Sequence, residues 1–230
     1  MAATGVSPVT AWVRAGTRQR LSDALELQKT RKVMLSAADR WQTYDRSRND
    51  AARVRAAWKT EVMRMRQHGE LLDVVDALCA FGIAGELEAR GWAQRRFRRA
   101  PAEARLPGRW PGSRDGGYQE SVQMRLPSEL AARVLDTCWG TSAPHIARLR
   151  DWRDRNPGIV IPRGPLGRTD ELTGPMAEYE RLASQVTTVG DIYRAGIHRG
   201  IEAAEERASH YRVLLDTHRD AGGHVSGIAG

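Results

Sequence analysis

The chain has 230 residues, of which 41% are hydrophobic and 28% are charged. It is long enough to bury a substantial core, and its composition excludes a wholly disordered chain. No apolar run reaches the roughly 18 residues that a membrane-spanning helix needs, and the N-terminus lacks the long apolar segment of a secretion signal. We therefore expect a cytoplasmic protein without a membrane partner.

The net charge of +8 is concentrated in the N-terminal part of the chain. Residues 1–100 carry 19 basic and 11 acidic side chains, whereas residues 161–230 carry 8 basic and 10 acidic ones. All but three of the 36 basic residues are arginine, which suits bidentate contact to phosphate. A GC-rich coding sequence also produces this bias without any ligand, so the asymmetry is the better indication of a polyanionic partner.

Residues 1–16 lack periodicity and predict a flexible arm, and the next stretch, to Gly69, predicts one long helix or two helices with a tight bend. Apolar residues in this stretch form a coiled-coil-like seam that needs a partner helix. The partner is either the apolar segment 71–84 or the same helix of a second subunit, which would make a dimer. The seam consists of Ala37, Trp41, Tyr44, Ala51, Trp58, Val62 and Met65. For assembly we single out Trp41, Tyr44, Trp58 and Val62.

The stretch 101–117 has linker composition, with three prolines and four glycines. We place a domain boundary there, between a basic helical domain at 17–100 and a second helical domain at 118–220. The glycine-rich tail 221–230 is expected to fray. The predicted fold is mainly α, with a long N-terminal helical hairpin or coiled-coil-like region, a linker, and a small helical domain that has at most one short strand.

An alternating segment at 120–126 predicts that strand. One face would bury Val122, Met124 and Leu126, and the other would carry Ser121, Gln123 and Arg125. Pro127 ends the strand, and apolar stripes then predict helices at 128–139 and 142–155. The residues Gly140-Thr141-Ser142 predict a turn between these helices.

This arrangement, over about 35 residues, resembles the ribbon-helix-helix family of DNA-binding repressors. In that family two chains pair their strands into a ribbon that lies in the major groove. The resemblance implies that Ser121, Gln123 and Arg125 read bases and that the amides around Thr141 and Ser142 hold a phosphate. The same segment also fits an ordinary strand-capped helical hairpin. Residues 179–202 offer a competing match, without a strand directly before it.

A further basic cluster surrounds Phe97 next to the linker, and it consists of Arg95, Arg96, Arg98 and Arg99. These guanidinium groups would bind phosphate backbone or stack on bases. They would equally suit a solvated helix end, where basic residues favour the helix dipole.

Few other residues indicate a catalytic, metal or cofactor site. The six histidines lack metal-ligand spacing, and the glycine-rich stretch 108–117 lacks the phosphate-loop pattern, so we expect no metal and no cofactor. Cys79 and Cys138 are expected to be small core residues, and Gly196 and Gly200 are expected to permit close helix packing.

The sequence therefore predicts a non-enzymatic DNA-binding or DNA-associated regulatory or accessory protein. It would use arginine-rich helices and a strand in the major groove. The alternative is a helical structural or adaptor protein that self-assembles, or docks on a protein partner, through its long N-terminal helix.

Overall fold

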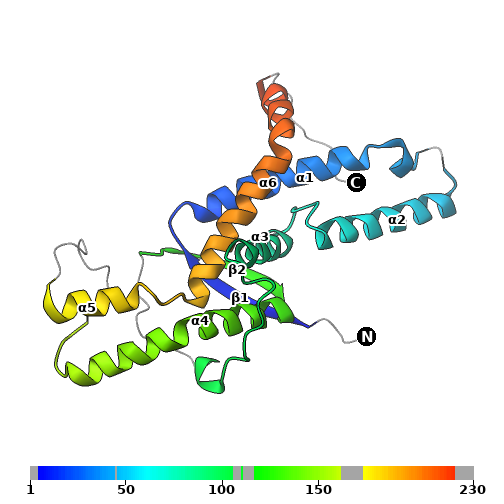
Figure 1. Ribbon diagram of the computed structural model, residues 1–230. Coiled ribbons are helices and arrows are strands. Elements are labelled where there is room, and N and C mark those ends of the chain that lie inside the picture. Colours follow the sequence, from blue (N-terminus) through cyan, green and yellow to red (C-terminus); the bar gives the residue numbers. More distant parts are fainter. Residues whose placement is uncertain (1–4, 45, 106–109, 111–116, 162–172, 221–230) are drawn as a thin grey trace.

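A computed structural model of the chain describes residues 5–44, 46–105, 110, 117–161 and 173–220, with Arg105 and residues 210–220 described by their backbone only. The fold is mainly helical with one small antiparallel sheet, which confirms the predicted class (Figure 1). No helix in these residues combines the length and the apolar character that crossing a bilayer requires.

The sheet is a ribbon of two strands from distant parts of the chain. Strand β1 (Val6–Val13) pairs antiparallel with β2 (Glu120–Pro127), and each residue of one strand has a partner in the other. The predicted strand at 120–126 is therefore confirmed. The prediction of a flexible arm at 1–16 is wrong for residues 6–13, because alternate residues there face the core and Ala11 and Val13 are buried.

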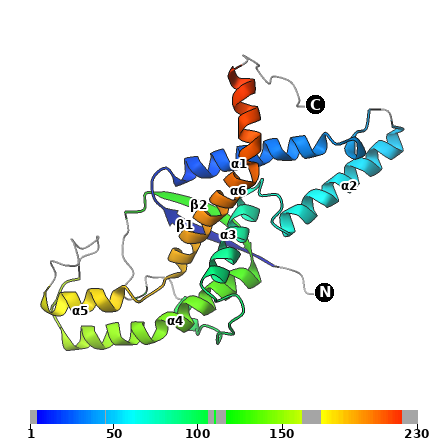
Figure 2. The ribbon, with the colours of Figure 1, turned by 45° about the horizontal axis from the view of Figure 1, so that its top comes forward.

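The long N-terminal helical stretch is two helices, α1 (Thr17–Ser36) and α2 (Arg48–Gln67). They are joined by residues 37–47, which include the 3-10 turn η1 (Asp39–Trp41), so the connection is longer than a tight bend. Figures 1 and 2 show these helices extending to one side of the molecule as an arm.

The predicted seam is interrupted by this connection. Ala37 and Trp41 lie outside both helices, and Tyr44 is 78% exposed. The α2 part of the seam packs within the chain, because Val62 and Met65 are buried against Leu71, with Trp58 partly buried beside them. The rings of Trp41 and Trp58 are 5.1 Å apart between centroids. The seam is therefore not one continuous helical stripe, and within the chain its α2 part packs on Leu71, the first residue of the apolar segment 71–84, and on Leu35 of α1.

The core is organised around the crossing of α3 (Val75–Ala89) and α6 (Val189–Asp220). A Cβ atom on Gly82 would lie 1.9 Å from the carbonyl oxygen of Gly196, and one on Gly200 would lie 2.5 Å from the carbonyl oxygen of Leu78. The two backbones approach so closely only because these residues lack side chains. The close packing predicted for Gly196 and Gly200 is confirmed.

Helix α4 (Ser128–Arg155) is continuous, so the turn predicted at Gly140-Thr141-Ser142 is wrong. The Thr141 hydroxyl donates to the carbonyl oxygens of Thr137 and Cys138, as a residue inside a helix does. Gly140 serves packing instead, since a Cβ there would lie 2.6 Å from a ring carbon of Phe97. The C-terminal half of α4 pairs with α5 (Gly174–Ala183) around buried Trp152 (Figure 2).

One hydrophobic core joins both halves of the chain. It contains residues from α1 and α3 and also residues from β1, β2, α4 and α6. Regions 17–100 and 118–220 therefore do not form separate domains. Of the predicted linker, residues 102–105 form the 3-10 turn η2 (Ala102–Arg105), whereas 106–109 and 111–116 lie outside the described residues, as does the tail 221–230.

The glycine crossing yields a stability prediction. Gly82→Ala forces a methyl group into the α6 backbone and should lower the free energy of unfolding by about 3 kcal/mol or more. Gly85→Ala on the same helix is the matched control, since its Cβ would meet only the flexible Arg199 side chain. It should be neutral or stabilising by up to about 1 kcal/mol through helix propensity. Urea unfolding measures both, and equal effects would contradict the crossing.

Candidate nucleic-acid interface

The outer face of the ribbon brings together polar side chains from both strands. On β2 it carries Ser121, Gln123 and Arg125, as predicted, and Gln123 and Arg125 are exposed. The residues opposite them on β1 are Trp12, Thr10 and Pro8. None of these six residues is acidic, so the face carries one positive charge and several hydrogen-bonding groups.

The inner face holds the ribbon against the helices. Val122, Met124 and Leu126 are buried with Ala11 and Val13 in the main core, which confirms the predicted alternation of β2. Because the inner face is anchored, the polar residues of the outer face have a fixed spacing.

Sequence reasoning missed Thr10 and Trp12, which β1 adds to the same face. Trp12 is 57% exposed although it is the largest side chain on the ribbon. The sequence contains the alternation that predicts a half-buried strand, because Val9, Ala11 and Val13 alternate with Thr10 and Trp12.

Glu120, at the start of β2, caps helix α1. Its carboxylate accepts hydrogen bonds from the backbone amides of Gly16 and Arg18, both at 3.0 Å. These bonds, from Arg18 first and then Gly16, hold the pKa of Glu120 below its usual value. The negative charge of Glu120 is therefore engaged with the first turn of α1 and does not belong to the outer face.

Arg194 supports the end of the ribbon next to Trp12. Its guanidinium carbon lies 3.9 Å from the ring centroid of Tyr118, and it also donates to the Trp12 carbonyl oxygen at 3.4 Å. Arg14 and Arg18, on the connection from β1 into α1, are both exposed. The end of the ribbon that leads into α1 therefore lies near Arg14, Arg18 and Arg194, of which Arg194 also forms an ion pair with Asp191.

The basic cluster around Phe97 lies elsewhere, along α4. Its four arginines are exposed in an extended segment beyond the end of α3, which corrects the alternative of a helix end. Two contacts hold the segment against α4. The ring of Phe97 packs on Gly140, and the amide of Ala100 donates to the Asp136 carboxylate at 2.8 Å. Since α4 packs on the inner face of the ribbon, the structure does not bring this cluster together with the outer face.

Thr141 and Ser142 do not form the predicted phosphate site. Their amides lie inside α4 and not at a helix start. The buried Ser142 hydroxyl donates to the carbonyl oxygen of Thr187 at 3.0 Å and accepts from the amide of that residue at 2.9 Å. It thereby fixes the loop before α6 to α4.

The two cysteines are buried core residues, as predicted. Burial raises the pKa of each thiol to about 12, so neither forms a thiolate near neutral pH. In the ranges that the structure describes, no three His, Cys, Asp or Glu side chains gather as a metal site would require.

No protein-family model matches the chain, and no significant match occurs among the curated proteins or the solved structures.

The Glu120 cap predicts a defined pH dependence. The pKa of Glu120 is lower in the folded state, so the cap stabilises the fold above the unfolded-state pKa and loses this effect as the pH falls through the folded pKa. Glu120→Gln, which keeps the shape without the charge, should unfold at a lower temperature than the parent protein at pH 7. The difference should shrink towards pH 3, as thermal unfolding followed by circular dichroism would measure. A constant difference across this range would rule out the charged cap.

Proposed function

We propose that the protein binds duplex DNA by placing the outer face of the β1–β2 ribbon in the major groove. The observation that carries this proposal is the ribbon itself, whose exposed face has polar side chains at fixed spacing and no acid. A two-stranded ribbon has the width that the major groove admits.

The ribbon is complete within one chain. In the ribbon-helix-helix family the second strand comes from another subunit, whereas here β1 supplies it. A single chain therefore presents two different strands, and its preferred site need not be palindromic. Dimerisation stays a prediction that the ribbon does not require.

The chemistry of the face suits base recognition. Gln123 has the amide that pairs with adenine in bidentate fashion, and Arg125 has the fork that pairs with guanine. Thr10 and Ser121 carry hydroxyl groups that serve either as donor or as acceptor. Contacts to phosphates would come from arginines, among them Arg14 and Arg18 near one end of the ribbon.

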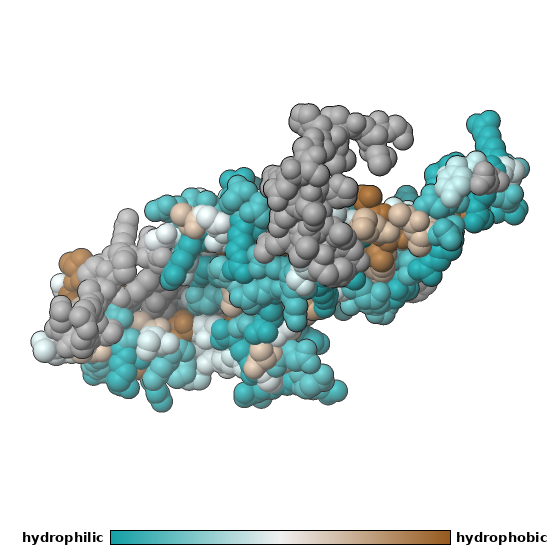
Figure 3. All heavy atoms as spheres, turned by 90° about the horizontal axis from the view of Figure 1, so that it is seen from above, coloured by the Kyte–Doolittle hydropathy of each residue, from teal (hydrophilic) through white to brown (hydrophobic). Residues whose placement is uncertain are grey.

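A second candidate function is protein docking through the α1–α2 arm. It is favoured by Val33 and Met34 of α1, which are 60% and 46% exposed. Figure 3 shows hydrophobic surface over this part of the arm. Weak binding to duplex DNA even at low salt, together with a dimer mass in solution, would favour this candidate over the first.

Changing the outer face should relax sequence preference. For Gln123→Ala with Arg125→Ala we expect an intact fold and a loss of about 1–3 kcal/mol of discrimination for each bidentate contact removed. The matched control is Gln185→Ala with Arg181→Ala, a similar pair of exposed side chains at the end of α5. Binding-site selection from random duplexes measures the preference. Equal loss of affinity for every sequence would mean that Arg125 contacts only phosphate.

The basic cluster lies away from the outer face, so it should add affinity only by contacting phosphates outside the groove that the ribbon occupies, without sequence preference. The test variant replaces four arginines by alanine: Arg95, Arg96, Arg98 and Arg99. The slope of the logarithm of the binding constant against the logarithm of the salt concentration should become less steep by about 3 to 4 if every arginine neutralises one phosphate. The preferred sequence should stay the same. Titrations of a labelled duplex between low and physiological salt measure the slope, and the parental slope in the variant would remove the cluster from the interface.

A further inference from the structure

Among the residues that the structure describes, the backbone groups of Ser121 and Gln123 on the edge of β2 that faces away from β1 have no hydrogen-bond partner. The amide of Ser128 donates to the carbonyl oxygen of Gly5 at 2.9 Å, and these residues lie opposite each other when the register is extended by one position. Antiparallel pairs alternate, so the amides of Ser121, Gln123 and Arg125 point away from β1. The amide of Arg125 confirms this, since it donates to Asp76 of α3 at 2.8 Å.

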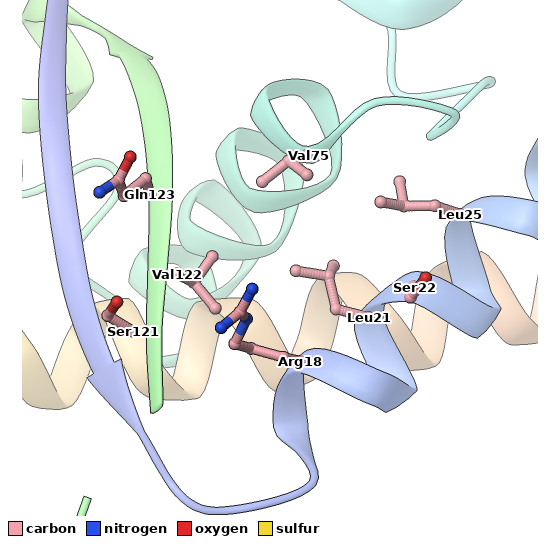
Figure 4. A pocket seen from close by; sticks show the side chains of 8 residues that line it. All are labelled: Arg18, Leu21, Ser22, Leu25, Val75, Ser121, Val122 and Gln123. Carbon is pink, nitrogen blue, oxygen red and sulfur yellow. The ribbon is translucent and has the colours of Figure 1, made fainter. Parts of the chain in front are cut away.

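A groove of about 530 Å³ lies along this edge, between β2, α1 and the start of α3. Figure 4 shows β2 between β1 and the groove, with the side chains of Leu21 and Val75 directed into it. Leu25 and Val122 complete its apolar lining, and its volume is that of an ordinary ligand pocket. The groove therefore combines an open strand edge with a lining that is half apolar and half polar, the polar half being Arg18, Ser22, Ser121 and Gln123.

The two ends of the groove differ in charge. Arg18 lines the end near Ser121 (Figure 4), and its positive charge helps to lower the pKa of the neighbouring Glu120, whose carboxylate accepts from the Arg18 amide and forms no ion pair with the guanidinium among the described residues. The carboxylate of Asp76 lies at the other end, where it holds the Arg125 amide. An extended segment in the groove would therefore place negative charge at Arg18.

We propose that this groove binds the C-terminal end of a partner protein that terminates in an apolar residue. The segment adds to β2 as a third strand, antiparallel to it, and pairs with the backbone of Ser121 and Gln123. Its apolar side chain enters between Leu21, Leu25 and Val75, and its terminal carboxylate binds Arg18. The charge of Arg18 sets the antiparallel direction. It holds the carboxyl end of the peptide next to Ser121, near the start of β2, so the peptide runs opposite to β2.

A peptide in the groove would prevent the ribbon from binding DNA, and this consequence rests on the proposed function. A third strand widens the sheet by about 4.8 Å, and the major groove admits two strands and not three. The peptide also contacts Gln123, which is proposed to read bases. Peptide and duplex DNA therefore exclude each other.

The test uses the full chain and a pool of fluorescein-labelled hexapeptides that end in Val, Leu, Ile or Phe. We expect binding of peptides with a free carboxylate and at least tenfold weaker binding of the same peptides as C-terminal amides. Arg18→Gln should abolish this difference, whereas Arg14→Gln, an exposed arginine that does not line the groove, should preserve it. Leu25→Glu should weaken both forms, and circular dichroism verifies that each variant is folded.

The outcomes separate the two proposals. The groove proposal is overturned if no peptide binds the folded protein, or if peptides with a free carboxylate and peptides with a C-terminal amide bind equally well. Either result counts whether or not the protein binds duplex DNA. If peptides bind as expected but duplex DNA does not bind at low salt, the proposed function fails and the groove proposal stands. If both ligands bind without competition, the mutual exclusion is overturned.

Discussion

The crossing of α3 and α6 determines where the rest of the chain packs. Gly82 approaches Gly196 and Gly200 so closely that no Cβ fits between the two backbones. The paired helices then form the surface on which the ribbon lies, with Ile83 and Ile197 in the same core as Met124. Without this contact the inner face of the ribbon would lose its support, and the fixed spacing of the outer side chains would be lost with it.

Polar groups fix the peripheral elements onto this centre. The buried side chain of Gln28 donates to the carbonyl oxygen of Ala204 at 2.7 Å and accepts from the amide of Leu72, so it joins α1 to α6 and to the segment between α2 and α3. Asp73 is buried beside Arg66, with which it makes two hydrogen bonds of 2.7 and 2.8 Å. Burial alone would raise the pKa of Asp73, but the bonds from Arg66 and Lys32 outweigh it and lower that pKa. Each of these groups has its partners in place, as buried polar groups require.

Local patterns predicted most of the helices and β2, but not β1, the continuity of α4 or the long-range pairing of the strands. The alternation of Val122, Met124 and Leu126 was sufficient to predict β2 and its two faces. Its partner β1 lies more than a hundred residues away in the chain, and no local signal states which strands pair. Gly140 predicted the end of a helix because glycine is common at helix ends. In the structure this glycine lies inside α4, where the absence of a side chain leaves room for the ring of Phe97. Half of the outer face was therefore predicted, namely its β2 residues. The alternation at residues 9–13 indicates a further strand, but only the pairing places Thr10 and Trp12 on the same face as Gln123.

Photocrosslinking tests most directly whether the outer face of the ribbon contacts duplex DNA. The buried thiols of Cys79 and Cys138, with pKa values of about 12, leave an introduced cysteine as the reactive one. A photoreactive group attached to Thr10→Cys or to Gln123→Cys should crosslink to a labelled duplex, and the same group on Lys59→Cys, exposed on α2, should not. Crosslinks from position 59 with none from positions 10 and 123 would contradict the account.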